Sequence, residues 1–334
     1  MSSPPRNESS AMLSPERIIE QRLGRYKSTD SDDTTQVLRQ FFSVLPPDGR
    51  ANLADDAREC VTDERLRKLV KRIYNGLLLP IKASGGKTPT DETPFYLRKD
   101  FEDSFENTTA LDLDSITKSP QKRLRDHCLQ RYGFRCVATK YCSAYHPRPK
   151  DAKKADLEVA HIILFNIASF DPKTPTESDR HANIWVNISR YFPTLEDMSF
   201  TLEQLNTERN AMMLERSLHW EFGAFRLCFI ATGVDNQYHV KTFEDTLTVP
   251  CLILPADRLA TFQPHKGGWD LPDPELLRIH ASLTEFFNMS GHGKRIDRLL
   301  TEFEELGGLA SDGSTNVEDL LASRLLSLAV DVRE

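Results

Sequence analysis

The chain has 334 residues, which is enough for one large or two small domains with a buried core. Apolar residues make up 39% and charged residues 28%, a composition typical of a water-soluble globular protein with some polar segments. The net charge of −7 argues against a surface that is basic throughout, as a general nucleic-acid coat protein would have.

The start of the chain, MSSPPRNESSAML, lacks the apolar core of a signal peptide. No apolar run approaches the roughly 18 residues that a membrane-spanning helix needs. None of the six cysteines has CxxC spacing, which argues against a four-thiolate zinc site. We therefore expect an intracellular protein of the cytoplasm or nucleus, with reduced thiols and no membrane contact.

The N-terminal third predicts helices. Residues 1–12 are rich in Ser and Pro and are expected to be disordered. Ser14 is followed by a proline, a pattern that favours the start of a helix. Apolar residues at helical spacing predict further helices over residues 34–44 and 63–78. Residues 13–117 are therefore predicted to be a helical region.

The centre of the chain mixes helix and strand patterns. Residues 122–132 favour a helix that ends at Gly133. Three apolar or β-branched segments favour strands: FRCVAT at 134–139, LEVAHIILF at 157–165 and AMML at 211–214. This order predicts a mixed α and β unit.

That unit continues into a short helix and a hairpin. SLHWEF at 217–222 favours a helix with Ser217 as its N-cap. Residues 225–231 and 238–244 favour a pair of adjacent strands. Together these segments predict one domain over residues 118–245.

The remainder of the chain again favours helices. Three helical segments follow Pro272, and the last of them is VEDLLASRLLSLAV at 317–330. Residues 246–334 are therefore predicted to be a helical region. The fold class predicted for the whole chain is α+β, with a central mixed unit flanked by mostly helical N- and C-terminal regions.

Charge is concentrated just before the central strands. Residues 118–154 contain eleven Lys and Arg against two acids, so the rest of the chain carries −16. An acidic protein with one basic segment can still contact phosphate there, although a solvated loop and helix face would have the same composition.

Three polar residues stand in an order typical of small metal-dependent nucleases. His161 follows a short strand, Asn210 precedes another, and His219 lies in the first turn of the helix after it. With the flanking segments RYGFRCVAT, LEVAHII and ERNAMMLERSLHWEFGAFRLCF, this set resembles the HNH endonuclease family, and more closely the HNH-domain proteins of filamentous fungi. The resemblance covers residues 131 to about 232.

The resemblance implies a ββα-metal fold and a chemistry. His161 matches the general base that activates water, Asn210 the structural asparagine, and His219 a metal ligand. A divalent ion (Mg²⁺, or Zn²⁺, Mn²⁺ or Ni²⁺) would bind the scissile phosphate, and a phosphodiester of DNA or RNA would be hydrolysed. No nucleotide-cofactor motif is present, and the oligomeric state is not indicated.

Two positions depart from the family pattern. The residue before the base is often a metal ligand, but here it is Ala160. A second ligand commonly lies four residues after the helix histidine, where this chain has Gly223. Strand alternation predicts that Glu158 points to the other face, as a surface or capping acid. His219 is then the one clear metal ligand, and a lone imidazole is a poor site for Mg²⁺.

These departures leave a second hypothesis, a catalytically degenerate HNH-fold module that binds nucleic acid or protein without cleaving it. A third is a recruited fold whose pocket residues come from the helical flanks, although no motif supports it. If the domain acts on nucleic acid, the phosphate contacts predicted by position beside the site are basic residues of the loop before His161. They are Arg148, Lys150, Lys153 and Lys154.

Overall fold

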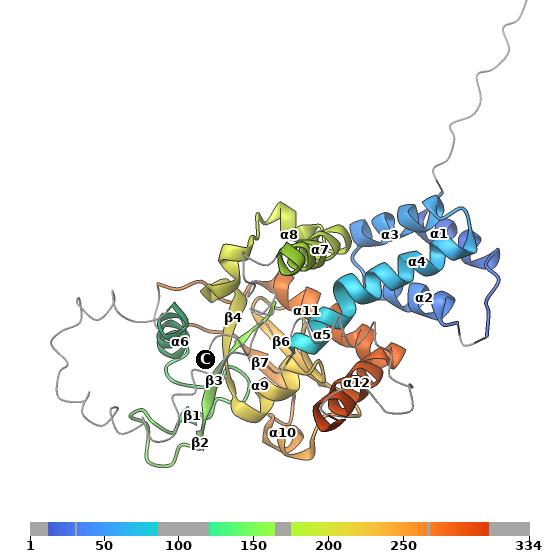
Figure 1. Cartoon of the computed structure of the whole chain (residues 1–334). Coiled ribbons are helices and arrows are strands. Elements are labelled where there is room, and N and C mark those ends of the chain that lie inside the picture. Colours follow the sequence, from blue (N-terminus) through green and yellow to red (C-terminus); the bar gives the residue numbers. More distant parts are fainter. Residues whose placement is uncertain (1–12, 31, 86–119, 164–174, 266–267, 307–334) are drawn as a thin grey trace, which may run out of the picture.

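A computed structural model describes residues 13–30, 32–85, 120–163, 175–265 and 268–306. Helices gather at the N-terminal end, and the small sheets lie among helices from the rest of the chain (Figure 1). The mixture of helices and small sheets is consistent with the predicted α+β class. None of the helices within these ranges has both the length and the apolar character required to cross a membrane. The segments predicted as disordered (1–12) and as the last helix (317–330) lie outside the described residues.

The N-terminal helices pack through the faces that the sequence marked as apolar. The structure confirms α1 with Ser14 as its N-cap, and α2 with Phe41 fully buried. It also contains a helix that we did not predict, α3, which begins at a proline and buries Leu53. The elements are α1 (Pro15–Gly24), α2 (Thr34–Val44), α3 (Pro47–Glu59), α4 (Asp63–Ile73), a π-helical turn (Tyr74–Leu78) and α5 (Leu79–Ser84).

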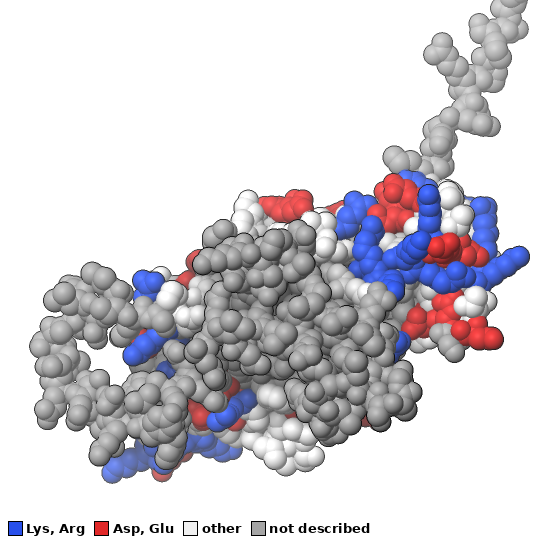
Figure 2. All heavy atoms as spheres, in the orientation of Figure 1, with Lys and Arg blue, Asp and Glu red and all other residues white. Residues whose placement is uncertain are grey.

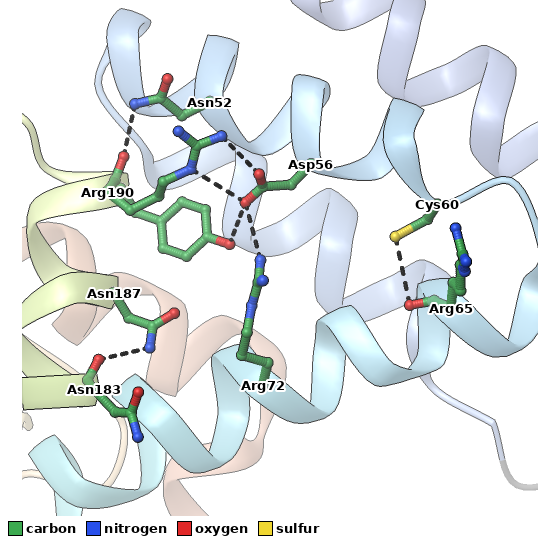
Figure 3. Close-up of polar contacts among 9 residues, drawn as sticks. Asn52, Asp56, Cys60, Arg65, Arg72, Asn183, Asn187 and Arg190 are labelled. Atoms are coloured by element: carbon green, nitrogen blue, oxygen red, sulfur yellow. Dashed lines mark hydrogen bonds and ion pairs between the residues drawn. The ribbon is translucent and has the colours of Figure 1, made fainter. Parts of the chain in front are cut away.

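An ionic cluster fastens these helices to the centre of the chain (Figure 3). The Asp56 carboxylate on α3 is 10% exposed, and its oxygens lie 2.7 Å from Nη2 of Arg190 and 3.2 Å from Nη2 of Arg72. The Tyr191 hydroxyl donates to the same carboxylate at 2.9 Å. Arg190 and Tyr191 end α7 (Pro175–Tyr191), so one buried acid joins α3, α4 and α7.

The segment after α6 (Pro120–Arg131) differs from the prediction. Gly133 ends this helix in the left-handed region, at φ 59°, as expected. Phe134 also has a positive φ of 60°, so the chain reverses instead of extending. The strand predicted over 134–139 is therefore wrong: these residues form a turn with a single bridge from Arg135 to Cys142. The short strands β1 (Cys142–Ser143) and β2 (Lys154–Ala155) follow and pair in parallel.

Both predicted central strands are present, although the first ends at His161 and does not continue through Ile162 and Ile163. β3 (Leu157–His161) pairs antiparallel with β4 (Ala211–Glu215), with His161 opposite Ala211. The helix α9 (Arg216–Gly223) follows β4 without a break and contacts β3. Between the two strands lie α7 and the short helix α8 (Thr194–Asp197).

A three-stranded sheet and two long helices complete the described chain. β5 (Leu227–Ala231) and β6 (Gln237–Thr242) form the predicted antiparallel pair. β7 (Leu259–Thr261) adds a third strand that the sequence did not predict, and it lies beyond residue 245. The helix α11 (Pro274–Ser290) packs on β5 and on α2. The remaining helices are α10 (Thr248–Ile253) and α12 (His292–Leu306).

Candidate functional site

The β3–β4 pair and α9 bring the three signature residues together. Glu158 is the second residue of β3 and His161 is its last, and α9 begins directly after β4. The predicted N-cap Ser217 is wrong, because Glu215 has that role. Its carboxylate accepts from the backbone N–H groups of Ser217 at 2.9 Å and Leu218 at 3.1 Å. The cap fixes the first turn of the helix, where His219 lies.

Asn210 is fully buried, and its side chain forms hydrogen bonds to the backbone that follows β3. Its side-chain oxygen accepts from the Ile163 N–H at 2.8 Å. Its amide nitrogen donates to the carbonyl oxygens of Ile163 and Leu205, each at 2.8 Å. Every one of these partners is a backbone group, so Asn210 holds two loops in place rather than facing a substrate.

A buried arginine holds the backbone on both sides of Asn210. Arg131 on α6 is 0% exposed and donates to the carbonyl oxygens of Glu208 at 2.9 Å and Ala211 at 2.6 Å. It also donates to the carbonyl oxygen of Asp270. Since Glu208 and Ala211 flank Asn210, this guanidinium fixes the backbone that presents the asparagine.

His161 lies at the end of β3, 6% exposed. Its Nε2 is 3.1 Å from the side-chain oxygen of Asn206. Burial lowers the pKa of His161 to about 4, opposed by the Asn206 hydrogen bond and reinforced by the nearby His219. The imidazole is therefore neutral at pH 7, the protonation state that a proton acceptor needs.

His219 has an acidic partner that the sequence did not predict. Its Nδ1 lies 2.7 Å from Oε2 of Glu158, and the other oxygen of that carboxylate is 3.4 Å from Arg216 Nε. We expected Glu158 to be a surface or capping acid that points away from the site. It contacts His219 instead, because α9 packs against the side of β3 where Glu158 lies. A carboxylate and an imidazole therefore stand together beside His161.

The donor set for a metal ion is small. Within the described parts of the chain, no group of three or more His, Cys, Asp or Glu side chains is placed to hold a metal. Ala160 is fully buried, and Gly223 has no side chain. The Glu158–His219 pair offers two donor atoms 2.7 Å apart, and adjacent ligand atoms in an octahedral shell with bonds of ~2.1 Å lie about 3 Å apart. Mg²⁺ commonly takes only one or two protein ligands and keeps several waters.

Other acids near the site have structural roles or lie outside the description. Glu221 is 0% exposed and pairs with Arg226 at 2.8 Å. Asp179 and His181, which could have folded back toward the site, belong to α7, but their side chains lie outside the described ones.

Cysteine thiols do not form a metal site among the described residues. Cys136, Cys142 and Cys228 are all buried. Cys136 lies in the turn instead of a strand, and its sulfur accepts from the N–H groups of Thr139 at 3.4 Å and Glu215 at 3.3 Å. This thiol joins the turn to β4.

The basic loop lies between β1 and β2, directly before β3. Lys150, Lys153 and Lys154 are exposed, and Figure 2 shows Lys and Arg side chains around this end of the molecule. Arg148 is partly buried and donates to the carbonyl oxygens of Ala144 at 3.0 Å and His146 at 3.2 Å. Lys153 lies over the ring of Tyr141 at 5.2 Å. Lys150 and Lys154 are therefore the better placed for phosphate, and Arg148 shapes the loop.

Large apolar residues of the segment between the two central strands are packing residues. Ile188, Tyr191 and Phe192 are 0% exposed, and Trp185 stacks on Phe200 with ring centroids 6.2 Å apart. With Tyr191 buried, this cluster offers no stacking platform for bases.

Comparison with known proteins gives one match. No curated protein and no solved structure matches the chain. Residues 136–230 match the family model described as HNH endonuclease, and this range contains His161, Asn210 and His219. The match supports the presence of an HNH domain in this segment, and it suggests a nuclease or nucleic-acid-binding function.

Proposed function

We propose that residues 118–245 form an HNH-type, metal-dependent endonuclease domain that hydrolyses phosphodiester bonds of nucleic acid, with His161 as general base. The observation that carries the proposal is the Glu158–His219 pair, 2.7 Å apart, beside a buried neutral His161 in the segment that matches the HNH family. Kinship with the HNH-domain proteins of filamentous fungi is part of the same proposal.

In this proposal Glu158 and His219 would hold the divalent ion. When bound, the ion would neutralise charge on the scissile phosphate and on the leaving oxygen. The carboxylate oxygen favours Mg²⁺ or Mn²⁺, with water and phosphate oxygens as the remaining ligands. Glu158 would thus take the place of the acid or histidine that many HNH sites have at the position of Ala160.

His161 would accept the proton of the attacking water. The hydrogen bond between Nε2 and the side chain of Asn206 would hold the orientation of the His161 ring. Asn210 keeps the segment after His161 in place, and Lys150 and Lys154 would contact the phosphate backbone.

The alternative function is an HNH-fold module that binds nucleic acid or protein without cleaving it. The observation that favours it is the absence, among the described residues, of any group of three metal-binding side chains. Such a module would bind no metal in elemental analysis, and a chelator would leave its stability unchanged.

Nicking of supercoiled plasmid tests the proposal. We expect nicking with Mg²⁺ or Mn²⁺ that stops with EDTA, falls at least about 100-fold in His161→Ala and persists in the matched control His239→Ala. His239 is exposed on β6, outside the site. Absence of nicking with Mg²⁺, Mn²⁺, Ni²⁺ and Zn²⁺ would favour the binding module.

A further inference from the structure

An apolar surface lies next to the candidate site. Ten large hydrophobic residues are more than a third exposed in the described chain, and four of them belong to α9, α10 or the residue before α10. They are Trp220 (54% exposed), Leu247 (57%), Val249 (63%) and Leu252 (77%). We name this set the α9–α10 surface.

The four residues share one region of the fold. The helices α9 and α10 contact each other, and Trp220 directly follows His219. Figure 2 shows an uncharged area at the lower edge of the molecule, where Figure 1 places α10. Proteins rarely leave several large apolar side chains exposed in one place unless another segment or partner covers them.

The C-terminal end of the described chain passes close to this surface. Lys294 near the start of α12 pairs with Asp245 at 3.1 Å, and Asp245 precedes Leu247 by two residues. Side chains of α12 as far as Thr301 line a cavity of about 580 Å³ together with Ala224, the residue after α9. The helix continues for five residues beyond Thr301, to Leu306, and 28 residues follow it in the sequence.

The sequence of those last residues suits a docking segment. The spacer GGLASDGSTN at 307–316 is rich in Gly and Ser and can span up to about 33 Å. It leads into VEDLLASRLLSLAV at 317–330, where Val317, Leu321, Leu325 and Leu328 have helical spacing. A lone amphipathic helix of this length is marginal in water, so its apolar face needs a partner surface.

We propose that residues 317–330 form an amphipathic helix that docks on the α9–α10 surface of the same chain. The docking would cover Trp220 and Leu252 and would place a C-terminal helix against the helix that carries His219. The proposal is independent of cleavage, because it rests on exposed apolar residues and on chain connectivity rather than on the metal site.

Hydrogen exchange of the full-length chain, followed by mass spectrometry, tests this docking. We expect amides in 317–330 to exchange at least tenfold more slowly than in a synthetic peptide of the same sequence. The double substitution Val249→Asp with Leu252→Asp removes that protection. The double substitution Leu321→Asp with Leu325→Asp, made in the docking segment itself, also removes the protection. It should in addition make the amides of α10 exchange faster.

The matched control is Val61→Asp, at a residue that is 75% exposed in the loop before α4 and should leave the protection unchanged. Thermal unfolding of each variant checks that the rest of the fold is retained. The proposal is overturned if 317–330 exchanges like the free peptide, or if its protection survives Val249→Asp with Leu252→Asp. Protection that disappears on dilution would identify a second copy as the occupant and would also overturn it.

Discussion

The most specific stability prediction concerns Asn210. Replacing it with alanine removes three hydrogen bonds of 2.8 Å each and leaves the N–H and C=O of Ile163 and the C=O of Leu205 without that partner. A buried polar group that loses its partner costs about 1–3 kcal/mol. At the lower end of that range for each group, Asn210→Ala should lower the free energy of unfolding by about 3 kcal/mol.

Urea unfolding at pH 7, followed by circular dichroism, measures this difference. The matched control is Asn187→Ala, because Asn187 is also buried but donates a single side-chain hydrogen bond, to Asn183 O at 2.7 Å. We expect about 1 kcal/mol for the control, with an unchanged denaturant slope in both variants. If Asn210→Ala costs no more than Asn187→Ala, the role of Asn210 in fastening the loops is refuted.

Three further predictions follow from the same structure. Burial lowers the pKa of His280 to about 3 from 6.5, so the unfolded chain takes up the proton first and stability falls as the pH drops below 6.5. Between pH 7 and pH 5 this histidine should lower the free energy of unfolding by about 2 kcal/mol. In His280→Gln, urea titrations at the two pH values should show a decrease that is smaller by about this amount. Arg131→Met removes the donor to three backbone carbonyl groups, of which that of Ala211 belongs to a buried residue, and it should lower the free energy of unfolding by at least about 2 kcal/mol in the same assay. Charge reversal of Lys150 and Lys154 should weaken DNA binding. The plot of log binding constant against log salt concentration should become less steep, by an amount that corresponds to about two phosphate contacts. Fluorescence anisotropy from about 50 to 200 mM salt measures this slope, and an unchanged slope would exclude the loop from the interface.

Much of the central unit could be predicted from its residues. The strands β3 and β4 have continuous apolar or β-branched sequences, and the positions of His161, Asn210 and His219 relative to them follow directly from that pattern. The turn at 134–139 could not be predicted in the same way. Its apolar residues suit a strand, but Gly133 and Phe134 both have positive φ and reverse the chain.

The acidic partner of His219 was missed for a geometric reason. Alternation along a strand tells which residues share a face, but it does not tell which side of the strand a following helix crosses. No sequence pattern pointed to a role for Asn206, because it lies in a short 3-10 helix without periodicity. The role of Arg131 could have been predicted. It shares the buried face of α6 with Leu124 and Cys128, and a charged residue on such a face indicates a buried structural role.

The two proposed functions differ most directly in the metal site that Glu158 and His219 would form. Titration of the full-length protein with Mn²⁺, followed by electron paramagnetic resonance, measures the number of ions bound and their affinity. The nuclease account predicts one ion per chain, with affinity lowered at least about tenfold in both Glu158→Gln and His219→Ala. Absence of stoichiometric binding, or an affinity that neither substitution changes, would contradict it.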